Sequence, residues 1–346
     1  MVMMSYREAL YEVMSTALED PRVIIIGQGV SDCKGIFGTT LGLADKYGYN
    51  RVIDTPLAEE GITGICIGAA LNGIYPINTH IRADFALSAT NQIINLAAKY
   101  RYMFDGNFEI PMMIRMVIGR SWGQGAQHSQ SLQSLYAHIP GLTVVMPASS
   151  WSILNWYKWA LTYPNPVIFI EHRLLYDIKF EIEPPTDNSS SFIVRKGKDI
   201  TIVATSIMVL EAIRAAKYLS DYDIDCEIID LNCISHPDWS VVIESLKKTG
   251  KLLVADTSWL PYGVSAEVCR IISTTDPTLL KVPVVTLGME FTTCPTAKAL
   301  EDLFYPNQNK LVHSIVQLVT GKQLHSIPLP DETSMADVYK KFKGPF

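Results

Sequence analysis

The sequence lacks the features that mark several specialised classes of protein. No uninterrupted apolar run approaches the roughly 20 residues that a membrane-spanning helix needs. None of its 6 cysteines belongs to a C-x-x-C pair or clusters with histidines, which argues against a zinc site and a disulfide framework. A formal net charge of -6 gives no basic face for nucleic acid. We therefore expect a cytoplasmic protein whose partners are neither membranes nor nucleic acids.

Familiar phosphate and metal motifs are missing as well. There is no G-x-G-x-x-G after the first apolar run, no G-x-x-x-x-G-K-[ST] and no H-E-x-x-H. The glycine-rich stretch GQGVSDCKG at 27–35 follows an apolar run, but its spacing is wrong for dinucleotide binding. Any catalytic chemistry must come from other residues.

An alternation of strand-like and helix-like segments runs along the chain. Its 346 residues are 48% hydrophobic and 18% charged, which suits a globular protein of two domains. Strands that are apolar throughout and alternate with helices predict an α/β fold of two doubly wound domains, with parallel sheets covered on both faces. The predicted strands are 22–27, 111–119, 142–147, 166–171, 200–205, 226–231, 251–256 and 282–287, and the predicted helices are 6–19, 88–103, 150–162, 208–220 and 263–273.

The best linker candidate is EIEPPTDNSSSF at 181–192, where prolines, an Asp-Asn pair and serines interrupt the periodicity. We predict a front domain over 1–180, a linker over 181–195 and a rear domain over 196–330. The polar tail, 331–346, is expected on the surface or against a partner.

Residues 51–73, RVIDTPLAEEGITGICIGAALNG, combine two acids with a helix of small residues. Glu59 and Glu60 stand at the start of that helix, where they would complement the positive end of its dipole. Alternatively, one carboxylate is drawn into a dry cleft and donates a proton to a ligand. Close approach of another backbone is predicted at the glycines of this segment, which are Gly64, Gly68 and Gly73.

Two more side chains, in different segments of the chain, are candidates for ligand contact. Phe85, within THIRADFALSATNQIIN at 79–95, is either a core residue or a platform for a flat heterocycle. His128, within GQGAQHSQSL at 123–132, follows the strand among small and polar residues. It is either a solvated loop residue or a catalytic imidazole at the end of a strand.

Together these segments resemble the β subunit of the thiamine-diphosphate-dependent decarboxylase component of 2-oxo acid dehydrogenases. The resemblance runs from YREAL to TAKALEDLFYP and is strongest in RVIDTPLAEEGITGICIGAALNG, AAKYRYM, AQHSQSLQSLYAHIPGLTVVMP, KGKDITIVATSIMVLEAIRAAKYL, KTGKLLVAD and YGVSAEV. It implies a transketolase-like pyrimidine-binding domain followed by a transketolase-like carboxy-terminal domain. It also implies an enzyme that decarboxylates a 2-oxo acid and passes the acyl group to a lipoyl or other acceptor.

The resemblance assigns roles to single residues. Glu59 matches the glutamate that hydrogen-bonds to the aminopyrimidine of thiamine diphosphate, where a carboxyl favours the tautomer that deprotonates the thiazolium carbon. Phe85 matches the aromatic that packs on the pyrimidine, and Leu57 belongs to the same cofactor-binding group. His128 matches the histidine near the substrate and the acyl acceptor, where an imidazole can donate to an oxyanion or to an incoming sulfur.

Half of the family's cofactor site is missing from the sequence. The diphosphate and its Mg²⁺ are held in the family by a G-D-G motif and a later Asn, and the nearest stretch here, FDGNF at 104–108, lacks the first glycine. The oxygen ligands that Mg²⁺ needs must then come from another chain. The resemblance therefore implies an α subunit in an α2β2 heterotetramer, with a lipoyl acyltransferase as a further partner.

A monovalent ion is bound in many family members by backbone carbonyls and by the acid of an A-I-x-D-x-N-P stretch. The corresponding stretch here is ALTYPNP, with Tyr163 in the place of the acid. Met112, Ala160, Leu161 and Asn165 still offer oxygens. Loss of the charged ligand predicts weak or no binding of the ion.

Three positions near the implied pocket are candidates for substrate contact. His80 and Arg82 replace residues that are more apolar in common members, and Gln127 precedes the implied catalytic histidine. If His80 and Arg82 reach the pocket, the substrate is more polar or anionic than pyruvate. Otherwise they face solvent or the α chain, and Arg82 with Asp84 forms an ordinary surface pair.

Two further functions are consistent with the same residues. One is half of a split, transketolase-like carboligase that acts on sugars or aldehydes. The other is a non-catalytic subunit that only scaffolds an α partner, against which the presence of Glu59 and His128 argues.

Overall fold

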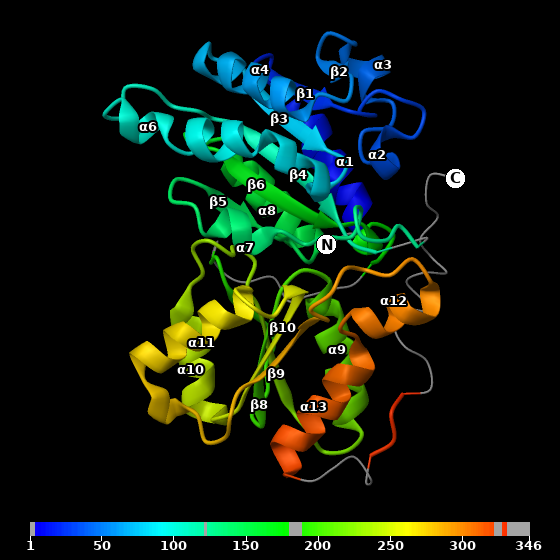
Figure 1. Cartoon of the computed structure of the whole chain (residues 1–346), viewed down its shortest axis with the longest axis vertical. Coiled ribbons are helices and arrows are strands. Elements are labelled where there is room, and N and C mark those ends of the chain that lie inside the picture. The colour runs from blue at the N-terminus through cyan, green and yellow to red at the C-terminus, as the bar shows by residue number, and fades with distance from the viewer. Residues whose placement is uncertain (1–3, 121–122, 180–188, 322–326, 331–346) are drawn as a thin grey trace. The chain divides into compact units, whose positions relative to one another are not determined.

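The computed structural model describes residues 4–120, 123–179, 189–321 and 327–330 (Figure 1). The chain divides into two compact units. The N-terminal unit contains the described residues up to Gly119 and those from Gln127 to 179. The C-terminal unit contains Arg120, the segment 123–126 and the described residues from 189 onward. Each unit is built on its own sheet.

The N-terminal unit has a six-stranded sheet of order β2-β1-β3-β4-β6-β5, and every pairing in it is parallel. Its middle strands are buried along their whole length, as expected for a parallel sheet that is covered on both faces. The sequence prediction of a doubly wound parallel sheet is therefore confirmed for this unit. The strands are β1 Val23–Gly27, β2 Val52–Asp54, β3 Tyr75–His80, β4 Met113–Ile118, β5 Thr143–Val145 and β6 Val167–His172.

Helices cover both faces of this sheet, as alternation along β3 shows. The Tyr75 hydroxyl donates to the Ala160 carbonyl on one face. The Asn78 side chain donates to Thr63 of a helix on the other face. The helices of this unit are α1 Tyr6–Ala17, α2 Gly35–Gly38, α3 Leu43–Tyr47, α4 Glu59–Leu71, α5 Ala83–Ala86, α6 Tyr100–Met103, α7 Gln133–Ala137 and α8 Ser150–Ala160, with short turns η1 Leu87–Ala89, η2 Gln92–Ala97 and η3 Arg173–Leu175.

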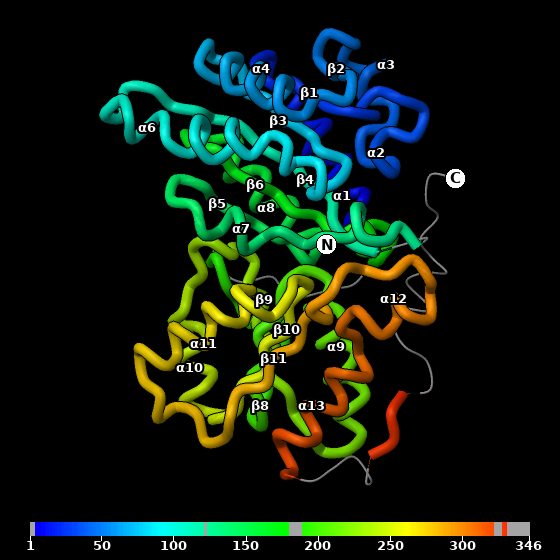
Figure 2. Tube along the Cα trace, in the orientation of Figure 1, coloured from blue at the N-terminus to red at the C-terminus, as the bar shows by residue number. Residues whose placement is uncertain are grey.

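The single helix predicted over 88–103 is a succession of α-helical, 3₁₀ and π-helical turns, which can be followed in Figure 2. Side chains compete with the helical ladder at its start. The Ser88 hydroxyl donates to the Phe85 carbonyl at 2.8 Å, and the Thr90 hydroxyl donates to the Leu87 carbonyl at 2.5 Å. Such local bonds offer the backbone an alternative to the regular helix, so a uniform helix is not formed.

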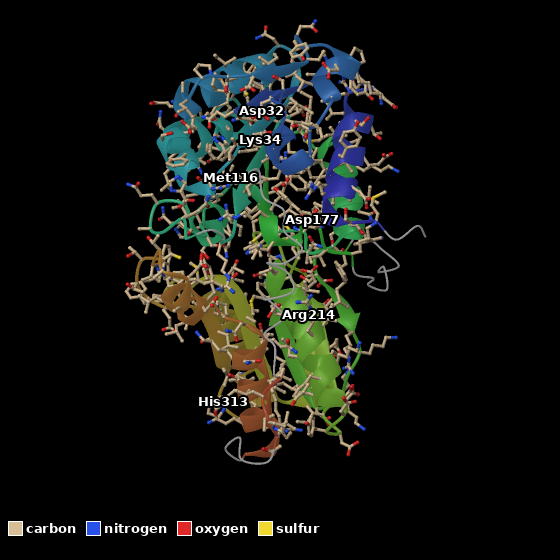
Figure 3. The ribbon with its side chains drawn as sticks, turned by 90° about the vertical axis from the view of Figure 1, so that its right-hand side faces the viewer. Asp32, Lys34, Met116, Asp177, Arg214 and His313 are labelled. Atoms are coloured by element: carbon tan, nitrogen blue, oxygen red, sulfur yellow. The ribbon has the colours of Figure 1, made fainter. Side chains whose placement is uncertain are left out.

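A buried ion pair joins β4 to β6 inside the N-terminal unit. Arg115 Nη2 donates to Glu171 Oε2 at 2.8 Å, and neither side chain is exposed. The hydroxyls of Tyr157 and Tyr176 donate to the same carboxylate at 2.9 and 2.8 Å. The pair is thus neutralised and hydrogen-bonded on both sides, which is what allows two charges to stay in an apolar interior. Figure 3 labels Met116, the next residue of β4.

The C-terminal unit has a five-stranded sheet of order β11-β10-β8-β9-β7. Strands β8, β9, β10 and β11 are parallel, but β7 pairs with β9 in the antiparallel sense. The prediction of wholly parallel sheets is therefore wrong at this edge, where a short strand with half-buried residues pairs along one side only. The strands are β7 Phe192–Arg195, β8 Ile200–Ala204, β9 Cys226–Asp230, β10 Leu252–Trp259 and β11 Val285–Met289.

The linker predicted over 181–195 needs correction at its far end, because Phe192–Arg195 form strand β7. Residues 181–188 and the tail 331–346 lie outside the described residues. On one face of the sheet, Thr201 contacts Ser245 and Thr249 of a helix. The helices of this unit are α9 Ile207–Ser220, α10 Trp239–Thr249, α11 Val264–Thr275, α12 Lys298–Phe304 and α13 Gln308–Thr320, with a turn η4 Pro277–Leu279. Helices α9 and α13 pack together on the other face. Figure 3 labels Arg214 on α9 and His313 on α13.

None of the helices in the described part of the chain is both long and apolar enough to cross a bilayer.

Asp230, at the end of β9, has a buried carboxyl group that is poorly hydrogen-bonded. Its Oδ1 has no hydrogen-bond partner among the described residues, and the Asn232 amide reaches its Oδ2 only at 3.5 Å. Burial raises the pKa of this carboxyl well above its usual value of 3.8. The folded protein therefore binds this proton more tightly than the unfolded chain does, and stability falls as the pH rises above 3.8.

We predict that Asp230→Asn raises the free energy of unfolding at pH 8 by about 1–3 kcal/mol, because a neutral amide replaces a poorly paired buried charge. The gain should shrink as the pH is lowered toward 4. Thermal unfolding from pH 4 to 8 measures both effects. Asp221→Asn, at an exposed position, is the matched control. A lower midpoint for Asp230→Asn at pH 8 would contradict the prediction.

Candidate functional site

Helix α4 places two acids at its first turn, and the structure gives them different surroundings. Ala58 precedes them without a side-chain cap. Glu60 is exposed, and its carboxylate accepts a hydrogen bond from Gln92 at 3.0 Å. Glu59 is half-buried, and its negative charge acts on the ring of His80. Glu59 is thus less exposed than Glu60, and its charge reaches the imidazole at the end of β3.

His80 is the last residue of β3 and is only 3% exposed. Burial lowers the pKa of its imidazole to about 4, and the nearby charge of Glu59 opposes this shift only in part. The Asn78 amide nitrogen lies 3.2 Å from Nε2, and the Thr63 hydroxyl lies 3.5 Å from it. His80 is therefore a neutral ring at physiological pH, held by two polar neighbours. The alternative that it faces solvent is wrong.

Phe85 and His128 meet although the chain separates them widely. Their ring centroids lie 5.1 Å apart with an interplanar angle of 83°, which is an edge-to-face contact. Phe85 is 41% exposed and His128 is half-buried, so both rings remain open on one side. An aromatic face and an imidazole thus stand together at the surface of the N-terminal unit.

Asp84 holds this pair together, a role that the sequence did not reveal. Its Oδ1 accepts a hydrogen bond from the backbone N–H of Gln130 at 3.1 Å. The bond joins helix α5, which carries Phe85, to the loop that carries His128. Burial raises the pKa of the Asp84 carboxyl, while bonding from Gln130 and the charge of His128 lower it. Its place one residue before an aromatic matched to the cofactor was the only signal in the sequence.

Arg82 precedes α5 and is 7% exposed. Its guanidinium lies over the ring of Phe37, 5.5 Å from the centroid. Asp84 is also buried and forms no ion pair with it within the described chain. The predicted surface pair of Arg82 and Asp84 is therefore wrong.

Taken together, Glu59, His80, Phe85 and His128 offer an acid, a neutral polar ring, an aromatic face and a second imidazole. These groups can hold a flat heterocycle through its edge and its face. They can also exchange protons with a bound ligand.

Comparison with known proteins identifies the family of this chain, with matches over most of its length. The models of the transketolase pyrimidine-binding domain and the transketolase C-terminal domain match residues 2–179 and 191–311. The pyruvate dehydrogenase E1 component subunit beta of Rickettsia conorii is 36% identical over 89% of this chain and 96% of its own length. The chain belongs to this E1 β family. The mitochondrial subunit beta of Rattus norvegicus is likewise 36% identical, over 91% of this chain and 90% of its own.

Solved structures agree at the level of the fold. A split-gene transketolase, described as an inactive beta4 tetramer, has a TM-score of 0.73 at 21% identity and covers 92% of this chain and 98% of its own. Transketolase from Campylobacter jejuni has a TM-score of 0.68 at 15% identity, over 91% of this chain and 47% of its own. The resemblance inferred from the sequence motifs is confirmed.

The other positions that the E1 β resemblance singles out are less closely gathered. Leu57, just before α4, is 83% exposed, and Gln127 is also exposed. The predicted ion ligands surround the end of α8 and the start of β6. The Ala160 carbonyl accepts from the Tyr75 hydroxyl at 2.8 Å, and the Met112 carbonyl accepts from Val167 N–H at 3.0 Å.

Leu161 and Asn165, the remaining predicted ion ligands, are half-buried. No group of three or more His, Cys, Asp or Glu side chains within the described ranges is placed to hold a metal ion. Asp105, in the stretch nearest to the family's metal motif, is exposed in a turn with a φ of 52°.

The glycines of α4 do not have the predicted close neighbours. A Cβ added at Gly68 or Gly73 would meet nothing within 4 Å, and one at Gly64 would meet only the Gln92 side chain at 3.9 Å. The prediction of a close backbone approach is therefore wrong for the described residues of this chain.

The bond from Gln130 to Asp84 predicts a positioning role for this carboxylate. Asp84→Ala should lower kcat by about ten-fold, because the N–H loses its acceptor and the loop of His128 loosens. Asp84→Asn keeps an acceptor oxygen and should retain most of the activity. Steady-state kinetics of the assembled enzyme, with thermal unfolding to exclude misfolding, measures the difference. Equal losses in both variants would show that the charge, not the hydrogen bond, matters.

Proposed function

We propose that the chain is the β subunit of a thiamine-diphosphate-dependent 2-oxo acid dehydrogenase and is active only with an α subunit. It would contribute the pyrimidine half of the active site, where a 2-oxo acid is decarboxylated and the acyl group passes to a lipoyl or other acceptor. The main support is the contact between Phe85 and His128, together with a half-buried Glu59 whose charge acts on His80, in a member of the E1 β family.

The described residues fit the pyrimidine part of the cofactor. Glu59 would present its carboxyl to the ring nitrogen, and the exposed face of Phe85 would pack on the ring. Leu57 is exposed beside them and offers apolar contact. When bound, thiamine diphosphate supplies the carbanion and the electron sink that decarboxylation requires.

The neutral state of His80 matters for this arrangement. A charged imidazole beside Glu59 would form an ion pair and compete with the pyrimidine for the carboxyl. Burial keeps His80 uncharged and leaves the Glu59 carboxyl available. His80 therefore does not neutralise the acid.

His128 would act on the other side of Phe85, toward the substrate and the acyl acceptor. It lies on a loop fixed by Asp84, and one edge of its ring packs against Phe85. From there an imidazole can donate to a developing oxyanion or to an acceptor sulfur. Gln127 is exposed next to it and would contact substrate from the same loop.

The diphosphate and Mg²⁺ are assigned to the α subunit, because the described residues offer no cluster of acids for the ion. We place the active site between α and β in an α2β2 heterotetramer, with a lipoyl acyltransferase as a further partner. A monovalent ion at Met112, Ala160, Leu161 and Asn165 is not favoured. The Met112 and Ala160 carbonyls already accept hydrogen bonds, and Tyr163 brings no charge.

Co-expression with an α subunit of the E1 family tests the proposal. The complex should decarboxylate a 2-oxo acid with a redox dye as electron acceptor and should acylate a lipoylated carrier, whereas either chain alone should do neither. Carboligation of aldehydes without reduction of the dye would favour the split transketolase instead. No turnover with any 2-oxo acid or aldehyde would favour a scaffolding subunit.

A further inference from the structure

Arg82 is a buried cation that lacks a carboxylate partner. It is 7% exposed, and its Nη1 donates only to the neighbouring Ile81 carbonyl at 3.0 Å. Its Nε is buried without a hydrogen-bond partner within the described residues. The nearest acid along the chain is Asp84, whose Oδ1 accepts a hydrogen bond from the backbone N–H of Gln130.

Two other buried arginines of the described chain are paired with acids. Arg115 forms a two-pronged ion pair with Glu171. Arg120 lies 3.3 Å from an Asp302 oxygen and over the ring of Tyr305. A third, Arg173, donates to the Gly119 carbonyl. Arg82 thus differs from Arg115 and Arg120, which each lie beside a carboxylate.

Burial of a guanidinium that forms no ion pair is unfavourable, because it removes the water that solvates the charge. Burial lowers the pKa of Arg82, and the charges of Tyr176 and Asp84 oppose this shift only in part. The Phe37 ring covers one side of the group and supports its plane. Loop 28–35 leads to Phe37. Within this loop, Asp32 Oδ1 accepts a hydrogen bond from Lys34 N–H at 2.8 Å, and Figure 3 labels both residues. A supported planar fork with unused donors is suited to binding an anionic group.

In the sequence, Arg82 lies close to two residues of the proposed active site. It precedes the helix that carries Phe85 by three residues and follows His80 by two. Of these two unusual polar residues, only Arg82 carries a positive charge at neutral pH, because His80 is buried and neutral. Of these two residues, Arg82 is therefore the one that can attract an anion near the end of β3.

An ion pair between Arg82 and the carboxylate that leaves as carbon dioxide would be lost as the reaction proceeds. Binding that is stronger in the ground state than in the transition state slows the chemical step. A group that stays on the acyl fragment keeps its ion pair throughout and contributes to recognition without such a penalty.

We propose that Arg82 binds a second anionic group of the substrate, a carboxylate or a phosphate, so that the preferred 2-oxo acid carries a negative charge on its side chain. The inference rests on the proposed function, because it takes the site to be that of a 2-oxo acid decarboxylase. It narrows the substrate class from 2-oxo acids in general to those with an acidic side chain.

Kinetics of the assembled two-chain enzyme tests the inference with pyruvate, 2-oxobutyrate and 2-oxoglutarate. The unmodified enzyme should prefer 2-oxoglutarate over 2-oxobutyrate. Arg82→Gln should lower kcat/KM for 2-oxoglutarate by about 100-fold and leave the value for 2-oxobutyrate within about three-fold, because only the diacid loses a charged partner. Arg82→Lys should retain part of the preference, since it keeps the charge but loses the fork.

Binding without turnover gives a second readout. Glutarate, which has no oxo group, should bind the unmodified complex more tightly than butyrate in calorimetry, and Arg82→Gln should abolish the difference. An unmodified enzyme that prefers 2-oxobutyrate, together with equal binding of glutarate and butyrate, would overturn the inference. A variant that loses its α subunit would overturn it too, since Arg82 would then pair with the partner chain. Glutarate selectivity without any decarboxylation would support the anion site and reject the proposed function.

Discussion

Glu59→Gln in the assembled enzyme is expected to lower kcat by about 10²–10⁴-fold, with folding and assembly unchanged. The loss of a positioned acid has an effect of this size when it takes part in proton transfer. The structure supports the assignment because Glu59 is half-buried and close enough to His80 to influence its ring. Dye-coupled decarboxylation of a 2-oxo acid measures the rate.

The neighbouring acid supplies a matched control for this experiment. Glu60 has the same side chain in the same helical turn, but it is exposed and bonded to Gln92. Glu60→Gln keeps an oxygen for that bond and should leave kcat within about two-fold, as surface substitutions usually do. Comparable losses in both variants would mean that the charge at the helix start, through its interaction with the helix dipole, matters more than contact with the cofactor.

Much of the fold follows from short-range patterns in the chain. All eight predicted strands correspond to strands of the two sheets, because buried parallel strands carry uniform apolar runs. The edge strand Phe192–Arg195 escaped prediction for the opposite reason, since it follows prolines and serines and is only partly buried. Helices α10 and α13 were not predicted, although each has an apolar face and a side-chain cap at its start.

The site was predictable only in part, for reasons of tertiary structure. The sequence singled out Glu59, Phe85 and His128 through family motifs, but it could not distinguish a buried His80 from an exposed one. Burial depends on what packs around a residue, and here α4 packs against the end of β3. The same holds for Asp84, whose partner lies far along the chain.

The end of β3 carries one residue beside the proposed acid and leads to another at the proposed anion site. β3 delivers His80 to the proposed acid and, two residues later, Arg82 to the proposed anion site. Burial keeps His80 uncharged, and Arg82 forms no ion pair within the described residues. We propose that His80 leaves the acid available to the cofactor and that Arg82 selects the substrate.

His128→Ala is expected to lower the rate of acyl transfer to a lipoylated carrier by about 10²–10³-fold, as the loss of one donor to a developing charge does. Decarboxylation with a small redox dye should fall less, because the dye needs no proton from the imidazole. The contact with Phe85 and the bond from Gln130 to Asp84 hold the loop where such a donor would be useful. Single-turnover assays with the two acceptors measure the two rates separately.

His138→Ala is the control for this experiment, because His138 lies at the end of α7 ten residues later and is exposed. It should change neither rate by more than about two-fold. If His128→Ala lowers both rates equally, the imidazole acts before the acyl group forms. If it lowers neither, His128 is a loop residue held only by its contact with Phe85, and the acyl acceptor must take its proton from the α subunit or from water.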